Sequence, residues 1–120
     1  MTKITSISLP GNIKKIGDYA FANCSSLKSV NITSSITETG QYIFKNCTSL
    51  TSVSLPKNLF EISLGAFYGC SSLKTISIPV GTHHIDGKAF YNCKALTSIY
   101  ILNSSFGSIG QYAFYGCYSL

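Results

Sequence analysis

Short segments in which aliphatic and polar residues alternate return along the whole chain. The segments SVNI, SVSL, TISI and SIYI, at positions 29–32, 52–55, 75–78 and 98–101, follow a period of two and are rich in β-branched residues. This pattern is typical of a short strand that buries one face. Proline follows three such segments, at Pro10, Pro56 and Pro79. Because proline cannot donate to a strand ladder, it is expected to end each of these strands.

The same residue types return at a fixed period. The five cysteines are 23, 23, 23 and 24 positions apart, and phenylalanine and leucine keep the same steps. The columns are Cys24, Cys47, Cys70, Cys93 and Cys117; Phe21, Phe44, Phe67, Phe90 and Phe114; and Leu27, Leu50, Leu73, Leu96 and Leu120. One such repeat cannot bury its own apolar face, so we expect about five turns to stack as a solenoid with parallel strands in register.

The second half of each repeat predicts a short turn followed by a tight corner. The segments IGDYAF, ISLGAF and IGQYAF suit a single turn of α-helix or 3₁₀-helix, and a 23-residue repeat leaves room for no more. The next column alternates asparagine and glycine, which tolerate positive φ angles. Its members are Asn23, Asn46, Gly69, Asn92 and Gly116. This column is therefore expected to turn the chain back toward the next strand.

The pattern L-x-x-I-x-I-P…I-G-x-x-A-F-x-x-C covers essentially the whole chain and resembles the BspA-like, treponemal-type leucine-rich repeat family. The resemblance implies an arc with a parallel sheet on its concave face and short helical, 3₁₀ or irregular segments on its convex face. It also implies a surface protein used for adhesion and protein binding, without catalytic residues. Thr33 and Leu102 replace the proline after the strand, Thr39 replaces a buried isoleucine, and Ile43 replaces alanine. These departures predict an irregular second turn.

Size and composition are those of one ordered domain spanning residues 1–120. A mass of 12.9 kDa is too small for two cores, and 45% hydrophobic against 11% charged residues excludes a disordered chain. Neither end carries the polar capping repeat that a solenoid needs. We therefore expect a fragment of a longer array that can associate end to end through exposed strand edges.

The charge pattern weighs against nucleic acid as a partner. The net charge of +5 comes from nine lysines, and there is no arginine. Because the lysines are scattered, they form neither a basic patch nor the bidentate contacts of arginine. No apolar run is long enough for a membrane span, and no signal peptide follows Met1. The family resemblance places such repeats at the cell surface or in a secreted protein, with the cytoplasm as the alternative.

The cysteines and histidines offer the sharpest candidates for chemistry. Five thiols in identical positions, one per turn, are poorly placed for disulfides or a tetrahedral zinc site, so we predict small buried apolar residues. His83 and His84 occur in one repeat only, with Asp86 close by. A surface pair is favoured there over a metal or catalytic site. The sequence thus predicts no cofactor, no metal and no enzyme.

Two surfaces could carry binding. The exposed side of the predicted strands would form a flat ladder of hydroxyl groups with little charge, and a solvated face without a ligand is the alternative. Its candidate residues for protein binding are Ser29, Asn31, Ser52, Ser54, Thr75, Ser77, Ser98 and Tyr100. The second surface consists of tyrosine columns, for which stacking along the outer face is favoured over a binding role. These columns are Tyr68, Tyr91 and Tyr115, and Tyr19, Tyr42 and Tyr112.

The sequence therefore predicts an interaction or adhesion module with a protein partner, such as a host or cell-surface protein. Its rival is a structural spacer within a longer surface protein. Four N-x-S/T sequons, at Asn23, Asn31, Asn46 and Asn103, would matter only in a glycosylating compartment.

Overall fold

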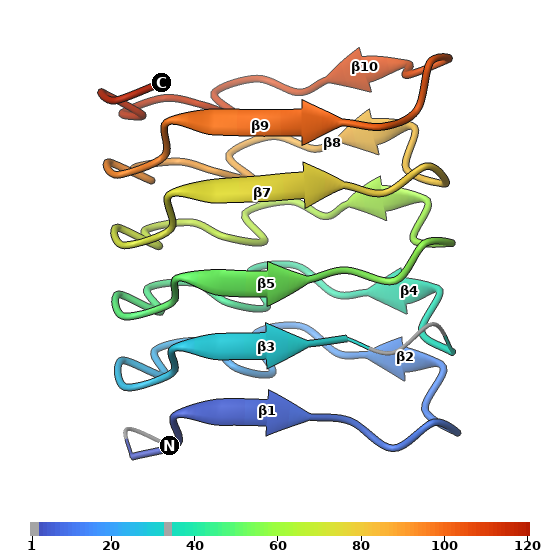
Figure 1. Ribbon diagram of the computed structural model, residues 1–120, viewed down its shortest axis with the longest axis vertical. Coiled ribbons are helices and arrows are strands. Elements are labelled where there is room, and N and C mark those ends of the chain that lie inside the picture. Colours follow the sequence, from blue (N-terminus) through green and yellow to red (C-terminus); the bar gives the residue numbers. More distant parts are fainter. Residues whose placement is uncertain (1–2, 33–34) are drawn as a thin grey trace.

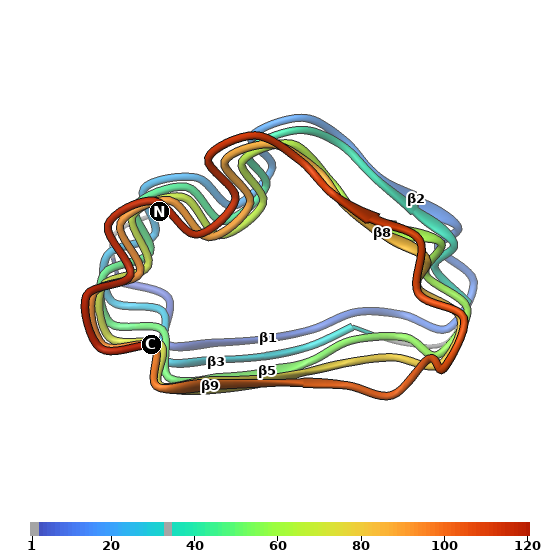
Figure 2. The same ribbon diagram turned by 90° about the horizontal axis from the view of Figure 1, so that it is seen from above.

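The chain winds into a stack of parallel turns in a computed structural model that describes residues 3–32 and 35–120. The longer strands follow one another along one face (Figure 1): β1 (Ser6–Ser8), β3 (Ser29–Asn31), β5 (Ser52–Ser54), β7 (Thr75–Ile78) and β9 (Ser98–Ile101). Two-residue strands form the opposite side (Figure 2): β2 (Lys15–Ile16), β4 (Glu38–Thr39), β6 (Glu61–Ile62), β8 (His84–Ile85) and β10 (Ser108–Ile109). The predicted solenoid is confirmed, and the second row of strands is a feature that the sequence pattern did not reveal.

All strand pairs are parallel and in register, but neither row is continuous. The long strands form the sheets β1-β3-β5 and β7-β9, and the short strands form β2-β4 and β6-β8-β10. Within the described residues, β5 is not paired with β7 and β4 is not paired with β6. Both interruptions involve the third turn. Its long strand, β5, pairs with β3 of the turn before, and its short strand, β6, pairs with β8 of the turn after.

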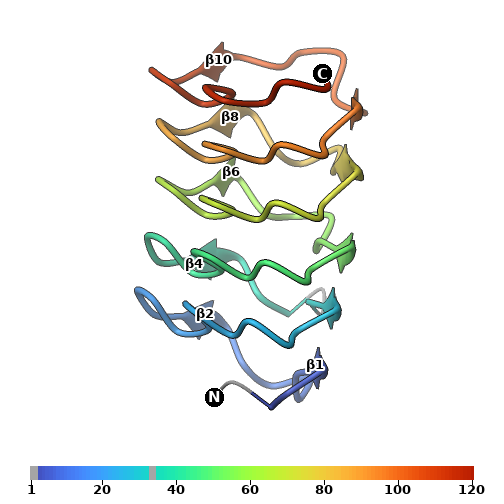
Figure 3. The same ribbon diagram turned by 90° about the vertical axis from the view of Figure 1, so that its left-hand side faces the viewer.

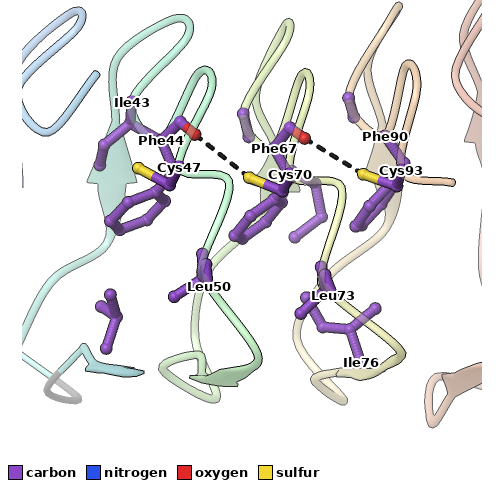
Figure 4. Packing of buried hydrophobic residues seen from close by; sticks show 14 of the residues in the cluster. Ile43, Phe44, Cys47, Leu50, Phe67, Cys70, Leu73, Ile76, Phe90 and Cys93 are labelled. Atoms are coloured by element: carbon purple, nitrogen blue, oxygen red, sulfur yellow. Dashed lines mark hydrogen bonds between the residues drawn. The ribbon is translucent and has the colours of Figure 1, made fainter. Parts of the chain in front are cut away.

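Identical side chains stack from turn to turn inside the solenoid. The rings of Phe44, Phe67 and Phe90 are buried and nearly parallel, with centroids 5.5 and 5.4 Å apart. Figure 4 shows these rings beside members of the cysteine and leucine columns, which are buried with them except at Cys117 and Leu120. Each repeat thus buries its apolar face against the same face of its neighbours, as the fixed period predicts.

The corner segments contain isolated turns in place of the helical turn that we predicted. The amides of Tyr19, Phe21 and Asn23 donate to carbonyls of the next turn, whereas those of Ala22 and Cys24 donate three residues back within their own turn. A helix needs consecutive bonds within one segment, so this alternation is incompatible with it. No helix occurs in residues 3–32 and 35–120. The helical prediction was therefore wrong, and these segments, which face the viewer in Figure 3, are irregular.

The predicted asparagine and glycine corner is confirmed by its backbone angles. Asn23, Asn46 and Asn92 have φ angles of 63°, 59° and 59°, and Gly69 and Gly116 have 75° and 79°. Because an added Cβ at Gly69 would collide with the Asn46 amide oxygen, the asparagine of one turn fills the space above the glycine of the next.

A second column of positive φ angles lies four residues earlier and was not predicted. Its members are Tyr19, Tyr42, Gly65, Lys88 and Tyr112. Two left-handed residues per corner leave no room for helical geometry between them, which is why the short helix does not form.

Two of the substitutions in the second turn can be followed in the structure. Ile43 is buried, so the larger side chain is accommodated in the alanine column. The hydroxyl of Thr39 lies 3.0 Å from that of Ser63, which also donates to the Thr39 carbonyl. This side-chain contact connects the second and third turns beside β4 and β6, which are not paired with each other in the described part of the chain. Thr33 lies outside the described residues.

Candidate functional site

The long strands present one polar face, here called the long-strand face, made of the outward residues of β1, β3, β5, β7 and β9. Alternate residues point outward along each strand because side chains alternate in a strand. Register places Ser29 beside Ser52, Asn31 beside Ser54, Thr75 beside Ser98, and Ser77 beside Tyr100. The structure thus brings all eight predicted residues onto one face, where Ser29 and Ser98 are half-buried and the other six are exposed.

A groove crosses the long-strand face where β5 and β7 are unpaired. It has a volume of about 400 Å³. Its lining consists of Val53, Ser54, Leu55, Lys57, Ser77, Pro79, Val80 and Leu102. Two of the predicted binding residues, Ser54 and Ser77, lie in this groove. The side chains of Val80 and Leu102 are 59% and 56% exposed, so apolar surface joins the hydroxyl ladder here.

Proline removes one possible hydrogen bond beside the groove, although it does not by itself interrupt a sheet, since Pro56 holds the equivalent position after the paired strand β5. One turn further on, the amide of Leu102 donates to the carbonyl of Ile78 over 3.2 Å. Pro79 occupies the equivalent position in the fourth turn and has no amide hydrogen, so it cannot donate to the carbonyl of Leu55. The prolines that sequence reasoning treated as strand ends therefore also limit pairing between turns.

The cysteine column has a structural role that includes a hydrogen bond. Each thiol from Cys47 onward donates to the carbonyl of the phenylalanine in the preceding turn, as Figure 4 shows for Cys70 with Phe44 and Cys93 with Phe67. The sulfur–oxygen distances of these two bonds are 3.2 and 3.1 Å. The thiols are free and four of the five are buried, which agrees with their predicted role as small apolar residues.

Burial makes these thiols poor nucleophiles. Desolvation raises the pKa of Cys47 to about 11 and that of Cys70 well above the ordinary value of 9.0. The pKa of Cys93 and that of Cys117 are also raised by burial. Because the thiolate is the reactive form, the column is unsuited to catalysis.

The two histidines pack against a neighbouring ring. The ring of Phe60 lies 5.1 Å from that of His83 and 5.3 Å from that of His84. Nδ1 of His84 is 2.6 Å from the Ser108 hydroxyl, and both histidines are half-buried. In residues 3–32 and 35–120, no group of three or more histidine, cysteine, aspartate or glutamate side chains is placed to hold a metal ion.

The acidic residues gather in a way that the sequence did not indicate. All four of them line one depression of about 230 Å³ beside β4 and β6, together with Lys15. They are Asp18, Glu38, Glu61 and Asp86. They come from four different turns, so only the stacking brings them together. Lys15 and Glu38 form an exposed ion pair of 3.9 Å, which contributes little to stability.

The tyrosine columns form a ladder along the corner segments. Tyr68, Tyr91 and Tyr115 stack with centroid distances of 4.7 and 4.9 Å. In the other column, Tyr42 leans over Gly65, where an added Cβ would collide with its ring, and meets Tyr68 edge-on at 5.9 Å. Stacking is therefore observed for Tyr68, Tyr91 and Tyr115 and for Tyr19 with Tyr42, whereas Tyr112 meets Tyr115 edge-on.

Comparison with known proteins shows that the chain is similar to leucine-rich repeat proteins of bacteria. The family described as BspA type Leucine rich repeat region matches residues 1–120 in six copies. A leucine rich cell surface protein of Faecalibacterium prausnitzii is 32% identical, with a TM-score of 0.93 over 98% of this chain and 31% of that one. The T. pallidum leucine rich repeat protein is 34% identical, with a TM-score of 0.90 over 96% of this chain and 56% of that one.

The chain thus spans about a third to a little over half of the length of these two solved structures. A leucine-rich repeat protein of Eubacterium ventriosum, 23% identical with a TM-score of 0.71, shares the fold. No curated protein matches the chain. Among the described residues, no helix has the length and apolar character that crossing a membrane would require.

Proposed function

Because the chain belongs to the BspA-type leucine-rich repeat family, we propose that it is a non-enzymatic protein-interaction module of an adhesive surface protein. Repeat domains of this family are a general protein-interaction fold and generally act as scaffolds without catalysis. The name of the F. prausnitzii relative, a cell surface protein, supports the proposed location of this chain.

The groove between β5 and β7 is the observation that carries the proposal. It joins the hydroxyl groups of Ser54 and Ser77 to the exposed side chains of Val80 and Leu102 where two parallel sheets meet. Interfaces commonly combine an apolar centre with a polar rim. A protein segment with apolar side chains and few charges fits this surface, since Lys57 is the only charged residue of the groove.

Charged substitutions on the long-strand face test the proposal. A pull-down with the folded chain identifies bound proteins, and a variant carrying Ser54→Lys, Ser77→Lys and Tyr100→Lys is compared with it. We expect the partner to be lost by this variant. The matched control carries Ser25→Lys and Thr37→Lys, two exposed residues away from the long-strand face, and should retain it.

Circular dichroism of each variant confirms that the fold is intact. A partner retained by the triple variant would contradict recognition through this face. Such a result, or the capture of no protein at all, would favour a structural spacer.

A further inference from the structure

A pocket lies between the two tyrosine columns of the fourth and fifth turns. It has a volume of about 280 Å³ and is lined by Lys88, Tyr91, Tyr112 and Tyr115. These residues belong to the corner segments, which Figure 2 shows to be separate from the long strands. The pocket is therefore distinct from the long-strand face.

The rings of this pocket form two walls. Tyr91 and Tyr115 are stacked at an interplanar angle of 20°, whereas Tyr112 stands at 86° to Tyr115 with a centroid distance of 5.7 Å. Tyr112 and Tyr115 are 51% and 53% exposed. Only the fifth turn carries tyrosine in both columns, so this perpendicular arrangement within one turn is particular to this end of the ladder.

The polar groups of the pocket are free of partners within the described chain. Lys45, between the tyrosines of the second and third turns, lies over the rings of Tyr42 and Tyr68 at 5.6 and 5.5 Å. Lys88 makes no such ring contact and no ion pair among the described residues. The hydroxyls of Tyr91, Tyr112 and Tyr115 likewise have no hydrogen-bond partner there. One ammonium and three phenols are thus available to a ligand.

We propose that this pocket binds a carboxylated pyranose sugar, such as a uronic acid. The ammonium of Lys88 suits the carboxylate, because a charge-assisted hydrogen bond is stronger than a neutral one. The phenols can donate to and accept from sugar hydroxyls. The aromatic walls suit the apolar C–H faces of a pyranose ring, and the pocket holds about one such ring. An acidic side chain of a peptide would use Lys88 but leave the three phenols unpaired.

Binding of small sugars to the folded chain tests this assignment. Methyl glucuronide, methyl glucoside and acetate are titrated separately while the tyrosine ring resonances are followed by NMR. Methyl glucuronide is expected to shift the pocket tyrosines and to bind about tenfold more tightly than the other two probes, because one charge-assisted contact accounts for roughly that factor. Raised salt should weaken it, since Lys88 is exposed.

Two lysine variants provide the matched comparison. Lys88→Gln should reduce the affinity for methyl glucuronide about tenfold and leave that for methyl glucoside unchanged. Lys45→Gln removes a different lysine beside the tyrosine columns, one that lies over the rings of Tyr42 and Tyr68, and should change the affinity for neither sugar. A glycan ending in glucuronate, titrated beside the monosaccharide, distinguishes a glycan terminus from a free sugar by its tighter binding.

Three results would overturn the proposal. These are no resonance shift with methyl glucuronide, equal affinity for methyl glucuronide and acetate, and equal losses in the Lys88→Gln and Lys45→Gln variants. Loss of protein binding by the long-strand face variant does not bear on this pocket, so the two proposals fail independently.

Discussion

The stacked phenylalanine column gives a quantitative test of how the solenoid is stabilised. Phe67 is 1% exposed and lies between Phe44 and Phe90, with ring centroids 5.5 and 5.4 Å away. Phe67→Leu keeps an apolar side chain but removes both ring pairs, each worth about 0.5–1.5 kcal/mol. The lost volume of roughly 20 Å³ adds about 0.5 kcal/mol at ~24 cal/mol per Å³. We therefore expect the free energy of unfolding to fall by about 1.5–3.5 kcal/mol.

Phe114→Leu is the matched control for this measurement. Phe114 is half-buried and stacks with Phe90 alone among the described residues, at 5.4 Å, so the same substitution should cost about 0.5–1.5 kcal/mol. Urea unfolding followed by circular dichroism measures both variants at the same protein concentration. Equal losses in the two variants would refute the idea that ring stacking between turns supplies the difference.

Three further predictions concern the cysteine and asparagine columns. The thiols of Cys24, Cys47, Cys70 and Cys93 should react with a thiol reagent slowly at pH 8 and fast in denaturant, and fast native labelling would contradict their burial. Because the folded pKa of Cys47 is about 11 against an ordinary 9.0, the folded state holds a proton that the unfolded chain releases. The stabilisation that comes from the raised pKa of Cys47 should be complete below pH 9 and fall as the pH rises from 9 toward 11. Midpoints of urea unfolding at several pH values measure this loss. Asn46 has a φ of 59°, so Asn46→Ala should lower the free energy of unfolding by about 1 kcal/mol, whereas Asn46→Gly should be nearly neutral. Thermal unfolding of the two variants should therefore give different midpoints. Equal midpoints would argue against backbone strain at this position.

Sequence reasoning succeeded where one residue type repeats and failed where different turns meet. The cysteine, phenylalanine and asparagine columns were readable because each turn places the same side chain in the same environment. The helical expectation failed because the left-handed residues at Tyr19, Tyr42, Lys88 and Tyr112 carry no glycine signal. Gly65 was the one glycine in that column, too little to reveal a shared backbone angle.

The candidate surfaces also differ in how far the sequence predicts them. The eight candidate residues on the long-strand face could be named from alternation alone, since side chains on alternate positions share a face. The groove beside Ser54 and Ser77 could not, because it depends on a missing pairing between β5 and β7. The tyrosine pocket could not be predicted from the sequence either, because the perpendicular setting of Tyr112 and the lack of a partner for the Lys88 ammonium among the described residues depend on how neighbouring turns pack.

The sequence by itself determined the period, the buried columns, the strand positions and the corner, because each depends on local chemistry repeated every 23 or 24 residues. Only the tertiary structure decided how the turns bond to one another. The carbonyl of Phe44 accepts the thiol of Cys70, β5 stays apart from β7, and four acidic residues from four turns meet in one depression. These contacts join residues in different turns, and their geometry follows from how well neighbouring side chains fit. A repeating sequence determines which side chains stack, whereas the groove and the pocket that we propose as binding sites depend on departures from the repeat.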